Sequence, residues 1–436
     1  MVVFRVTDNI NIKTTDGTLV KYTKVKGPSN LLNETIYITT LEDFSDLKKV
    51  FASVGNKYKA KIIDESKVRY LSQFPRELGI TNINEYNITN NLNYKYKDKI
   101  AIQSKDNSIE SVYLNEEKSD LKKQISGTLK KDVKVLILGS LGSSISEMIC
   151  ASTALRIFYE KLSKQFRSVK LDIYINASEN RFYSRDKMIF SNQAFVNKVS
   201  ALSIDVKEFC SYDFFVDASS VTKRSFYQTL NYTDAWLHKL GIDYKAIPNE
   251  QKYNEINFTS YKPKKDLQDK IRTIKQKGKV LLFHPYSANA AKSIPKEIAI
   301  KLLKKMIEKM PEYVFVSTLK LDPKFKNDRY FDLSNDSSSF IDFCYIVSNC
   351  EKVFTVNTST YHVADAFFIP SVVVLTDYDQ KRDIKEYEYS KAIYVKDKSK
   401  DYSQFIFKNE SLLLYRFDGW QELKASKVIK LLEKLW

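Results

Sequence analysis

The sequence predicts an α/β protein with two Rossmann-like, doubly wound domains facing a cleft and an extra α+β appendage at the N-terminus. At 436 residues, the chain is too long for one typical domain. From about residue 131 onward, apolar runs of strand length alternate with segments of helical period, which is typical of a parallel sheet. The alternation starts again after a charged, proline-containing stretch. We therefore divide the chain into an appendage (1–130), a first Rossmann-like domain (131–250) and a second one (251–436).

The appendage differs from the rest because its apolar segments are short and alternate with polar residues. Asp16 and Gly17 form a turn pair between two of these segments, and Glu42–Val54 has the period of a helix. The asparagine-rich stretch Asn82–Asn93 predicts a loop. Short strands are expected at Val2–Val6, Leu19–Val25, Thr35–Thr39 and Lys99–Gln103. Nothing in the appendage indicates a chemistry.

Each Rossmann-like domain is expected to contain strands that are apolar on both faces, because helices cover both sides of a parallel sheet. In the first domain we expect strands at Val133–Leu138, Val169–Ile175 and Phe214–Val216, and helices at Glu147–Leu162, Met188–Val199 and Ser225–Leu240. In the second we expect strands at Val280–Phe283, Tyr313–Ser317, Phe354–Val356 and Val372–Leu375, and helices at Pro295–Met310, Ser339–Ser348 and Lys424–Trp436. The last helix is lysine-rich and amphipathic, so it either docks on the core or lies on a membrane.

The formal charge of +17 is spread along the chain without a block of five basic residues. Nucleic-acid binders concentrate their charge on a recognisable module, so no nucleic-acid partner is expected. Diffuse charge is most simply a solvated surface, and otherwise it suits phosphorylated substrates or a peripheral contact with an anionic inner membrane. The polar N-terminus and the absence of a long apolar run predict neither a signal peptide nor a membrane span. The four scattered cysteines fit reduced thiols, and we expect a cytoplasmic protein.

The first candidate site is the turn GSLGSSISE, which follows the first strand of the first domain. Gly139 and Gly142 let the backbone approach a ligand closely. The hydroxyls of Ser140 and Ser143 offer donors at a helix start, although the spacing is neither that of GxGxxG nor that of a P-loop. Glu147 lies at the mouth of this helix. It is either a general base that accepts a proton from a hydroxyl, or a first-turn acid that complements the helix dipole.

The second candidate site consists of two polar turns in the second domain. The turn HPYSANAAK carries Ser287 and Lys292, and the lysine ammonium suits a diphosphate unless it is simply solvated. The other turn opens a helix, where orphan N–H groups and the helix dipole favour an anion, unless it is an ordinary N-cap. This turn comprises Asn357, Thr358, Ser359, Thr360 and His362. No acidic cluster is placed for a divalent cation, so neither a metal nor a cofactor is expected.

At these three segments the chain resembles glycosyltransferase family 9, the bacterial heptosyltransferases of lipopolysaccharide synthesis, over roughly residues 132–436. VKVLILGSLGSSISEMICASTALR is similar to the family's opening, in which a hydrophobic strand meets a glycine-rich GD turn and a helix that ends in PALR. FHPYSANAAKSIP resembles the family's HPG-S…K-WP segment. VFTVNTSTYHVADAFFIPSVVVL resembles its motif of strand, D-S/T-G-P-x-H-x-A-A-A, proline and strand.

The resemblance implies a GT-B fold in which the second domain holds most of the donor and the first domain receives the acceptor. It also implies inverting, metal-independent transfer from a nucleotide-diphosphate sugar, ADP-heptose in typical members, to a bacterial surface glycan, glycolipid or protein. In that reading, Ser287 and Lys292 would contact the diphosphate. The phosphate and sugar pocket would be lined by Thr358, Ser359, Thr360 and His362.

The chain departs from the family pattern at the acidic positions. The family's catalytic Asp falls on Glu147 or on Ser143, depending on which end of the motif is aligned, and its second Asp becomes Asn357. Two functions therefore remain open. One is a glycosyltransferase with Glu147 as the base, and the other is a non-catalytic sugar-nucleotide or glycan-binding protein that retains the GT-B fold.

Overall fold

The structure is a computed structural model that describes residues 1–24, 35–53, 55, 60–62, 74–80, 120–219, 221–258, 261–289, 292–376, 387–396 and 418–435. The chain divides into two compact units, Met1–Pro248 and Asn249–Trp436, and each is described by itself. The predicted strand Lys99–Gln103 and the predicted loop Asn82–Asn93 lie outside the described residues.

The first unit contains a five-stranded, wholly parallel sheet with the order β6-β11-β7-β8-β9. Its strands are β6 (Arg76–Glu77), β7 (Asp132–Leu138), β8 (Ser168–Ile175), β9 (Lys198–Ala201) and β11 (Phe214–Asp217). From β7 the chain adds β8 and β9 on one side and then crosses to β11 on the other. The carboxyl ends of β7 and β11 therefore form the switch point at which such sheets hold ligands.

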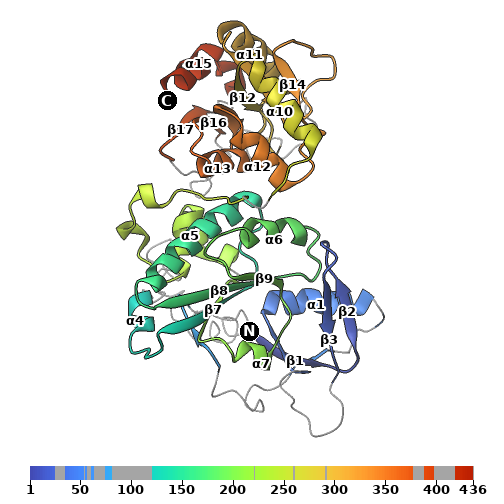
Figure 1. Cartoon of the computed structure of the whole chain (residues 1–436), viewed down its shortest axis with the longest axis vertical. Helices are drawn as coiled ribbons and strands as arrows, with labels where there is room; N and C mark the ends of the chain where they lie inside the picture. Colours follow the sequence, from blue (N-terminus) through green and yellow to red (C-terminus); the bar gives the residue numbers. More distant parts are fainter. Residues whose placement is uncertain are drawn as a thin grey trace, which may run out of the picture. The chain divides into compact units, whose positions relative to one another are not determined.

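The helices of this unit pack around the sheet (Figure 1). They are α4 (Leu121–Ile125), α5 (Ile145–Ser163), α6 (Tyr183–Ser191), α7 (Val206–Phe209), α8 (Ser225–Thr229) and α9 (Tyr232–Lys239), with 3-10 turns at Val221–Lys223 and Tyr244–Ala246. Helix α5 contacts β8, α6 and α9. Since it has neighbours on several sides, most of its side chains are buried and its sequence lacks a polar stripe.

The appendage shares strands with the first Rossmann-like half. A four-stranded antiparallel sheet, with the order β10-β4-β1-β5, combines three strands of the appendage with one from the parallel half. The strands are β1 (Val2–Val6), β4 (Tyr37–Thr39), β5 (Ala60–Ile62) and β10 (Ile204–Asp205). In return, the appendage provides β6 to the parallel sheet, where it pairs with β11. Each of the two sheets is therefore complete only when the appendage and the first Rossmann-like half have come together.

A hairpin and a helix complete the appendage. The hairpin joins β2 (Ile10–Lys13) and β3 (Leu19–Tyr22) through the predicted turn at Gly17, which has a φ of 85°. Helix α1 (Leu41–Ser53) lies beside this hairpin, and the rings of Tyr22 and Phe51 meet edge to face with centroids 6.1 Å apart (Figure 1). The strand predicted at Val2–Val6 and the helix predicted at 42–54 are confirmed.

The second unit contains a six-stranded, wholly parallel sheet with the order β14-β13-β12-β15-β16-β17. Its strands are β12 (Lys279–His284), β13 (Tyr313–Ser317), β14 (Tyr330–Asp332), β15 (Lys352–Val356), β16 (Ser371–Thr376) and β17 (Ser390–Val395). Its helices are α10 (Lys265–Lys277), α11 (Lys296–Lys309), α12 (Phe340–Ser348), α13 (Ser359–Ala366) and α15 (Ala425–Lys434), with 3-10 turns at Asn249–Gln251 and Asp418–Glu422. Here the switch point lies between β12 and β15.

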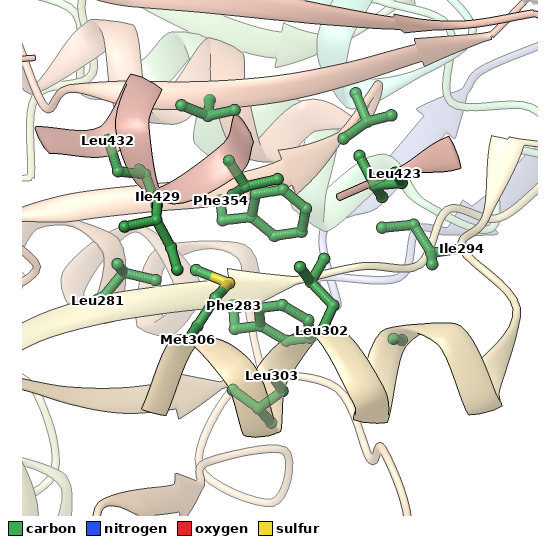
Figure 2. Packing of buried hydrophobic residues seen from close by; sticks show 14 of the residues in the cluster. Leu281, Phe283, Ile294, Leu302, Leu303, Met306, Phe354, Leu423, Ile429 and Leu432 are labelled. Carbon is green, nitrogen blue, oxygen red and sulfur yellow. The ribbon is translucent and has the colours of Figure 1, made fainter. Parts of the chain in front are cut away.

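One face of this sheet is covered by α11 and α15, whose apolar stripes meet over the central strands (Figure 2). Met306 of α11 lies against the sheet, and the rings of Phe283 and Phe354 stack on neighbouring strands with centroids 5.2 Å apart. Leu432 of α15 is fully buried in the same cluster. The C-terminal helix therefore docks on the core, as one of the two sequence alternatives predicted.

The predicted fold class, two Rossmann-like α/β halves with an α+β appendage, is confirmed. Two helix predictions were wrong in detail. The segment 188–199 contains the end of α6 and the start of β9, because the buried Val199 and Ala201 alternate with the exposed Lys198 and the half-buried Ser200 as in a strand. The helix predicted over Ser225–Leu240 is interrupted at Leu230, since the Asn231 side chain accepts a hydrogen bond from Asp234 N at 3.0 Å and starts a new helix.

Candidate functional site

The glycine-serine turn forms the carboxyl edge of the first sheet, between β7 and β11. Gly139 has a φ of 109°, and a Cβ placed on it would lie 3.1 Å from Ser219 N and 3.4 Å from Thr40 Cγ2. Gly142 has a φ of 142°, and its Cβ would lie 2.7 Å from the Cβ of Glu147. Both positions therefore require glycine, because a side chain would meet neighbouring atoms and strain the backbone.

Glu147 is buried and its carboxylate is held by hydrogen bonds. Oε1 accepts from the hydroxyls of Ser143 at 2.8 Å and Ser144 at 3.2 Å. Oε2 accepts from Ser143 N at 3.0 Å and from the Tyr227 hydroxyl at 2.9 Å. Ser144 in turn caps α5 by accepting from Glu147 N at 3.3 Å. This reciprocal arrangement is a variant of the capping box, so the carboxylate stabilises the turn whatever else it does.

The network around Glu147 also fixes Tyr227. Burial and the neighbouring Glu147 carboxylate raise the pKa of the Tyr227 hydroxyl, which stays protonated and donates to Glu147. The predicted residues Ser140 and Ser143 belong to the same turn, and the Ser140 hydroxyl donates to Gly142 O at 2.9 Å. The structure therefore brings all the predicted residues of the first site together, and adds Tyr227, which sequence reasoning missed because it lies 80 residues away.

Helix α1 of the appendage starts at this same edge. Thr40, whose Cγ2 lies next to Gly139, accepts a hydrogen bond from Asp43 N at 3.1 Å, and the Thr39 hydroxyl donates to Asp43 Oδ2 at 2.7 Å. Asp43 is fully buried, and burial raises the pKa of its carboxyl from 3.8 to about 6. Sequence reasoning missed Asp43, although the spacing Thr40-x-x-Asp43 is that of a helix N-terminus.

In the second unit, parallel pairing brings the two predicted polar turns to one edge. His284 at the end of β12 is in register with Thr355 near the end of β15, so the turns that follow these strands are neighbours. The first turn carries Ser287 and Lys292, and it is folded around Ser293. Ser287 N donates to Ser293 Oγ at 2.9 Å, and Lys292 N donates to Asn289 O at 3.0 Å.

The second turn opens α13 at the same edge. Thr358 is the N-cap: its hydroxyl accepts from Thr360 N at 3.1 Å and lies 3.3 Å from the Thr355 hydroxyl. Asn357 and Thr360 are buried, whereas Thr358 and Ser359 are partly exposed. A helix N-terminus that follows a strand next to one whose turn carries a serine and a lysine is suited to an anion such as a diphosphate.

The two histidines of these segments are buried and hold the scaffold. Burial lowers the pKa of His284 to about 4, so this ring is neutral at pH 7, and its Nδ1 lies 3.2 Å from the Thr318 hydroxyl. His362 Nδ1 lies 2.6 Å from the Tyr387 hydroxyl, which also accepts from Asn254 Nδ2 at 2.8 Å. The predicted residue His362 thus belongs to a buried polar network, whereas Thr358 and Ser359 lie at the exposed start of the helix.

Two general features bear on the site. Within the described ranges, no three His, Cys, Asp or Glu side chains lie close enough together to hold a metal ion. None of the helices in that part of the chain is long and apolar enough to cross a membrane.

Each of the two units contains a doubly wound sheet of parallel strands with a polar turn at its switch point. These features define a Rossmann-like protein with two such domains. The chain is similar in structure to solved glycosyltransferases. A glycosyltransferase of family 9 from Veillonella parvula overlaps with a TM-score of 0.46 at 11% identity, over 71% of this chain and 100% of that one. The E. coli ADP-heptose lipopolysaccharide heptosyltransferase II overlaps with a TM-score of 0.48 at 12% identity, over 69% and 98%.

A third similar structure is the iron-containing dodecameric glycosyltransferase TibC of enterotoxigenic E. coli, with a TM-score of 0.45 at 10% identity over 70% of this chain and 76% of that one. No protein-family model and no curated protein sequence matches the chain. The overlaps are too loose to carry an argument about activity, which therefore depends on the residues of the two sites.

Proposed function

We propose that the protein is an inverting, metal-independent glycosyltransferase that moves a sugar, a heptose or similar, from a nucleotide-diphosphate donor to a bacterial surface glycan, glycolipid or protein. The observation that supports the proposal is the pairing of β12 with β15, because the turn that carries Ser287 and Lys292 and the start of α13 follow these two neighbouring strands. A diphosphate there would meet the Lys292 ammonium and the helix dipole together, as a departing nucleotide diphosphate requires.

In this proposal the leaving diphosphate is bound by Ser287, Lys292, Thr358 and Ser359, with Asn357 and Thr360 fixing the turn behind them. ADP is the first nucleotide to try, because the sequence resembles heptosyltransferases that use ADP-heptose. Since nucleotide sugars are cytoplasmic metabolites and the chain carries a charge of +17, the reaction is assigned to the cytoplasm, at the anionic face of the inner membrane when the acceptor is a lipid.

Glu147 is the proposed base. Its Oε1 already accepts from the Ser143 hydroxyl at 2.8 Å, and an acceptor hydroxyl that displaced Ser143 would find the same oxygen. The capping role of Glu147 supports the second candidate, a non-catalytic sugar-nucleotide or glycan-binding protein that retains the fold. A carboxylate whose two oxygens already accept from Ser143, Ser144 and Tyr227 has to break bonds before it can act.

Calorimetric titration with ADP, UDP, GDP and CDP tests donor binding. We expect Lys292→Ala to weaken the preferred nucleotide at least tenfold, while Lys301→Ala, an exposed lysine on α11, leaves its affinity unchanged. Equal affinities for the wild type and both variants would refute the proposed diphosphate site.

Release of nucleotide diphosphate from a panel of nucleotide sugars then separates the two candidates. The transferase is expected to release it in the presence of an acceptor extract, and Glu147→Gln to lose release while still binding nucleotide. Nucleotide binding without release by the wild type would favour the non-catalytic candidate.

A further inference from the structure

One pocket in the C-terminal unit is lined by none of the residues proposed to bind the diphosphate. It has a volume of about 590 Å³ and is bounded by Tyr361 and Asp365 of α13, by β16 and β17, and by the segment that starts at Asn249. This volume falls within the range of roughly 300–1,000 Å³ that is usual for small-molecule sites. Thr358 and Ser359, which are proposed to bind the diphosphate, are not among the residues that line the pocket, so the pocket is a separate feature.

Aromatic side chains dominate the wall of this pocket. Six of them line it: Tyr253, Tyr361, Phe368, Tyr387, Tyr389 and Tyr394. Tyr361 and Tyr387 form its inner part, with ring centroids 5.5 Å apart, and the bonds from Tyr387 to His362 and Asn254 fix that ring. The inner wall is therefore rigid before any ligand arrives.

The rim of the pocket is built around Phe368, which is 52% exposed. Its ring lies 5.7 Å from that of Tyr253 and meets that of Tyr389 edge to face at 5.9 Å. Phe368 follows the end of α13 with a φ of 55°, while Ile369 N donates to Ala364 O at 2.9 Å and Phe368 N to Asp365 O at 3.0 Å. This is the Schellman pattern, in which the left-handed position is normally a glycine.

A phenylalanine at that position is unfavourable for the fold in two ways, because the backbone is strained and about half of the apolar side chain stays exposed. Tyr394 on β17 is also 54% exposed at the same pocket. Strain that presents an aromatic ring at the rim of a cavity points to a ligand that uses the ring.

The charge of the pocket indicates which ligand. Three carboxylates, of Glu250, Asp365 and Glu388, line it against one ammonium group, that of Lys391, whereas the whole chain carries +17. Such a wall repels phosphates, so it does not serve the diphosphate of a donor. A neutral saccharide matches it, because sugar hydroxyls donate to carboxylates while the C–H face of the ring lies on tyrosine and phenylalanine rings.

We propose that this pocket binds a neutral saccharide, as a glycan-binding site separate from the nucleotide site. The proposal does not depend on sugar transfer. A protein that only binds glycans would use the pocket in the same way, and Lys292→Ala would leave it intact. In a transferase, the site would hold part of a longer acceptor or product glycan and keep it on the enzyme.

Saturation-transfer NMR on the full chain tests the pocket. The probes are methyl glycosides of glucose, galactose, mannose and L-glycero-D-manno-heptose, together with lactose and maltose, at millimolar concentration. We expect at least one probe to receive saturation from the wild type and to bind at least fivefold more weakly to Phe368→Asn. Asparagine tolerates a positive φ, so this variant removes the ring without new backbone strain.

The matched control is Phe182→Ala, which removes a 59% exposed phenylalanine from the first unit and is expected to leave saccharide binding unchanged. Tyr394→Ala removes a second exposed ring of the same pocket, on β17, and is expected to weaken binding as well. The proposal is overturned when no probe binds the wild type, or when all variants bind alike. It is also overturned when a tetralysine peptide, in place of the sugars, binds in a way that Phe368→Asn abolishes.

Discussion

The buried carboxyl of Asp43 gives the first unit a pH-dependent stability that a single substitution should remove. Burial raises its pKa from 3.8 to about 6 in the folded protein. A carboxyl with a raised folded pKa contributes stability below its unfolded pKa and loses that contribution as pH rises through its folded pKa. Over this window the wild type should lose about 3 kcal/mol, because each pKa unit is worth about 1.4 kcal/mol.

Asp43→Asn should keep the hydrogen bond from Thr39 and cannot ionise. The free energy of unfolding of this variant, relative to wild type, should therefore rise by about 3 kcal/mol between pH 4 and pH 8. Urea unfolding at several pH values measures the difference. Pulsed hydrogen exchange of the α1 peptide during unfolding reports the first unit by itself.

Asp266→Asn is the matched control, because Asp266 is an exposed aspartate in the first turn of α10. It should show no such change with pH. Stability profiles of the wild type and Asp43→Asn that stay parallel from pH 4 to pH 8 would refute the assignment of a raised pKa to Asp43.

Three further predictions concern other positions. Phe368→Gly should raise the free energy of unfolding by about 1 kcal/mol, seen as a higher melting temperature, because glycine adopts the left-handed conformation without strain. An unchanged or lower melting temperature would contradict the assignment of backbone strain to Phe368. Tyr227→Phe should lower stability by about 1.5–3 kcal/mol in urea unfolding, since it removes a buried hydrogen bond to the Glu147 carboxylate; a neutral effect would mean that this bond contributes little. Lys352→Met should lower the free energy of unfolding by about 1–3 kcal/mol in urea, because the buried Lys352 ammonium donates to Leu432 O, and to Leu435 O at 2.8 Å, at the end of α15. A stability equal to that of the wild type would show that water replaces the ammonium.

Sequence reasoning predicted the parallel elements well because both faces of their strands are apolar. The first strand and helix of the first domain were expected at Val133–Leu138 and Glu147–Leu162 and lie at Asp132–Leu138 and Ile145–Ser163. It failed where apolar residues fit two periods, as at 188–199. It also missed β17, whose half-exposed residues do not form an apolar run.

The candidate sites were predictable only in part. The sequence pattern indicates the parallel strands that precede the Lys292 turn and α13, but the direct pairing of β12 with β15 came from the structure. The direction of His362 toward Tyr387 depends on a contact between residues 25 positions apart, which no local pattern contains. The capping role of Glu147 was one of the two readings that its spacing allowed, and the structure supplies the bonds for it.

The exchange of strands between the appendage and the first Rossmann-like half has a consequence for biosynthesis. Strand β6 pairs with β11, and Arg76 is in register with Phe214. Since Phe214 is synthesised well over a hundred residues after Arg76, β6 has no partner strand until β11 has left the ribosome. At about 5–20 residues per second this delay lasts roughly 7–28 s. During that time the N-terminal segment has unpaired strand edges, which are the surfaces that aggregate and recruit chaperones. Removal of residues 1–130 would leave β11 without β6 and β10 without β4, so the N-terminal segment cannot be trimmed away to obtain a smaller protein without exposing strand edges.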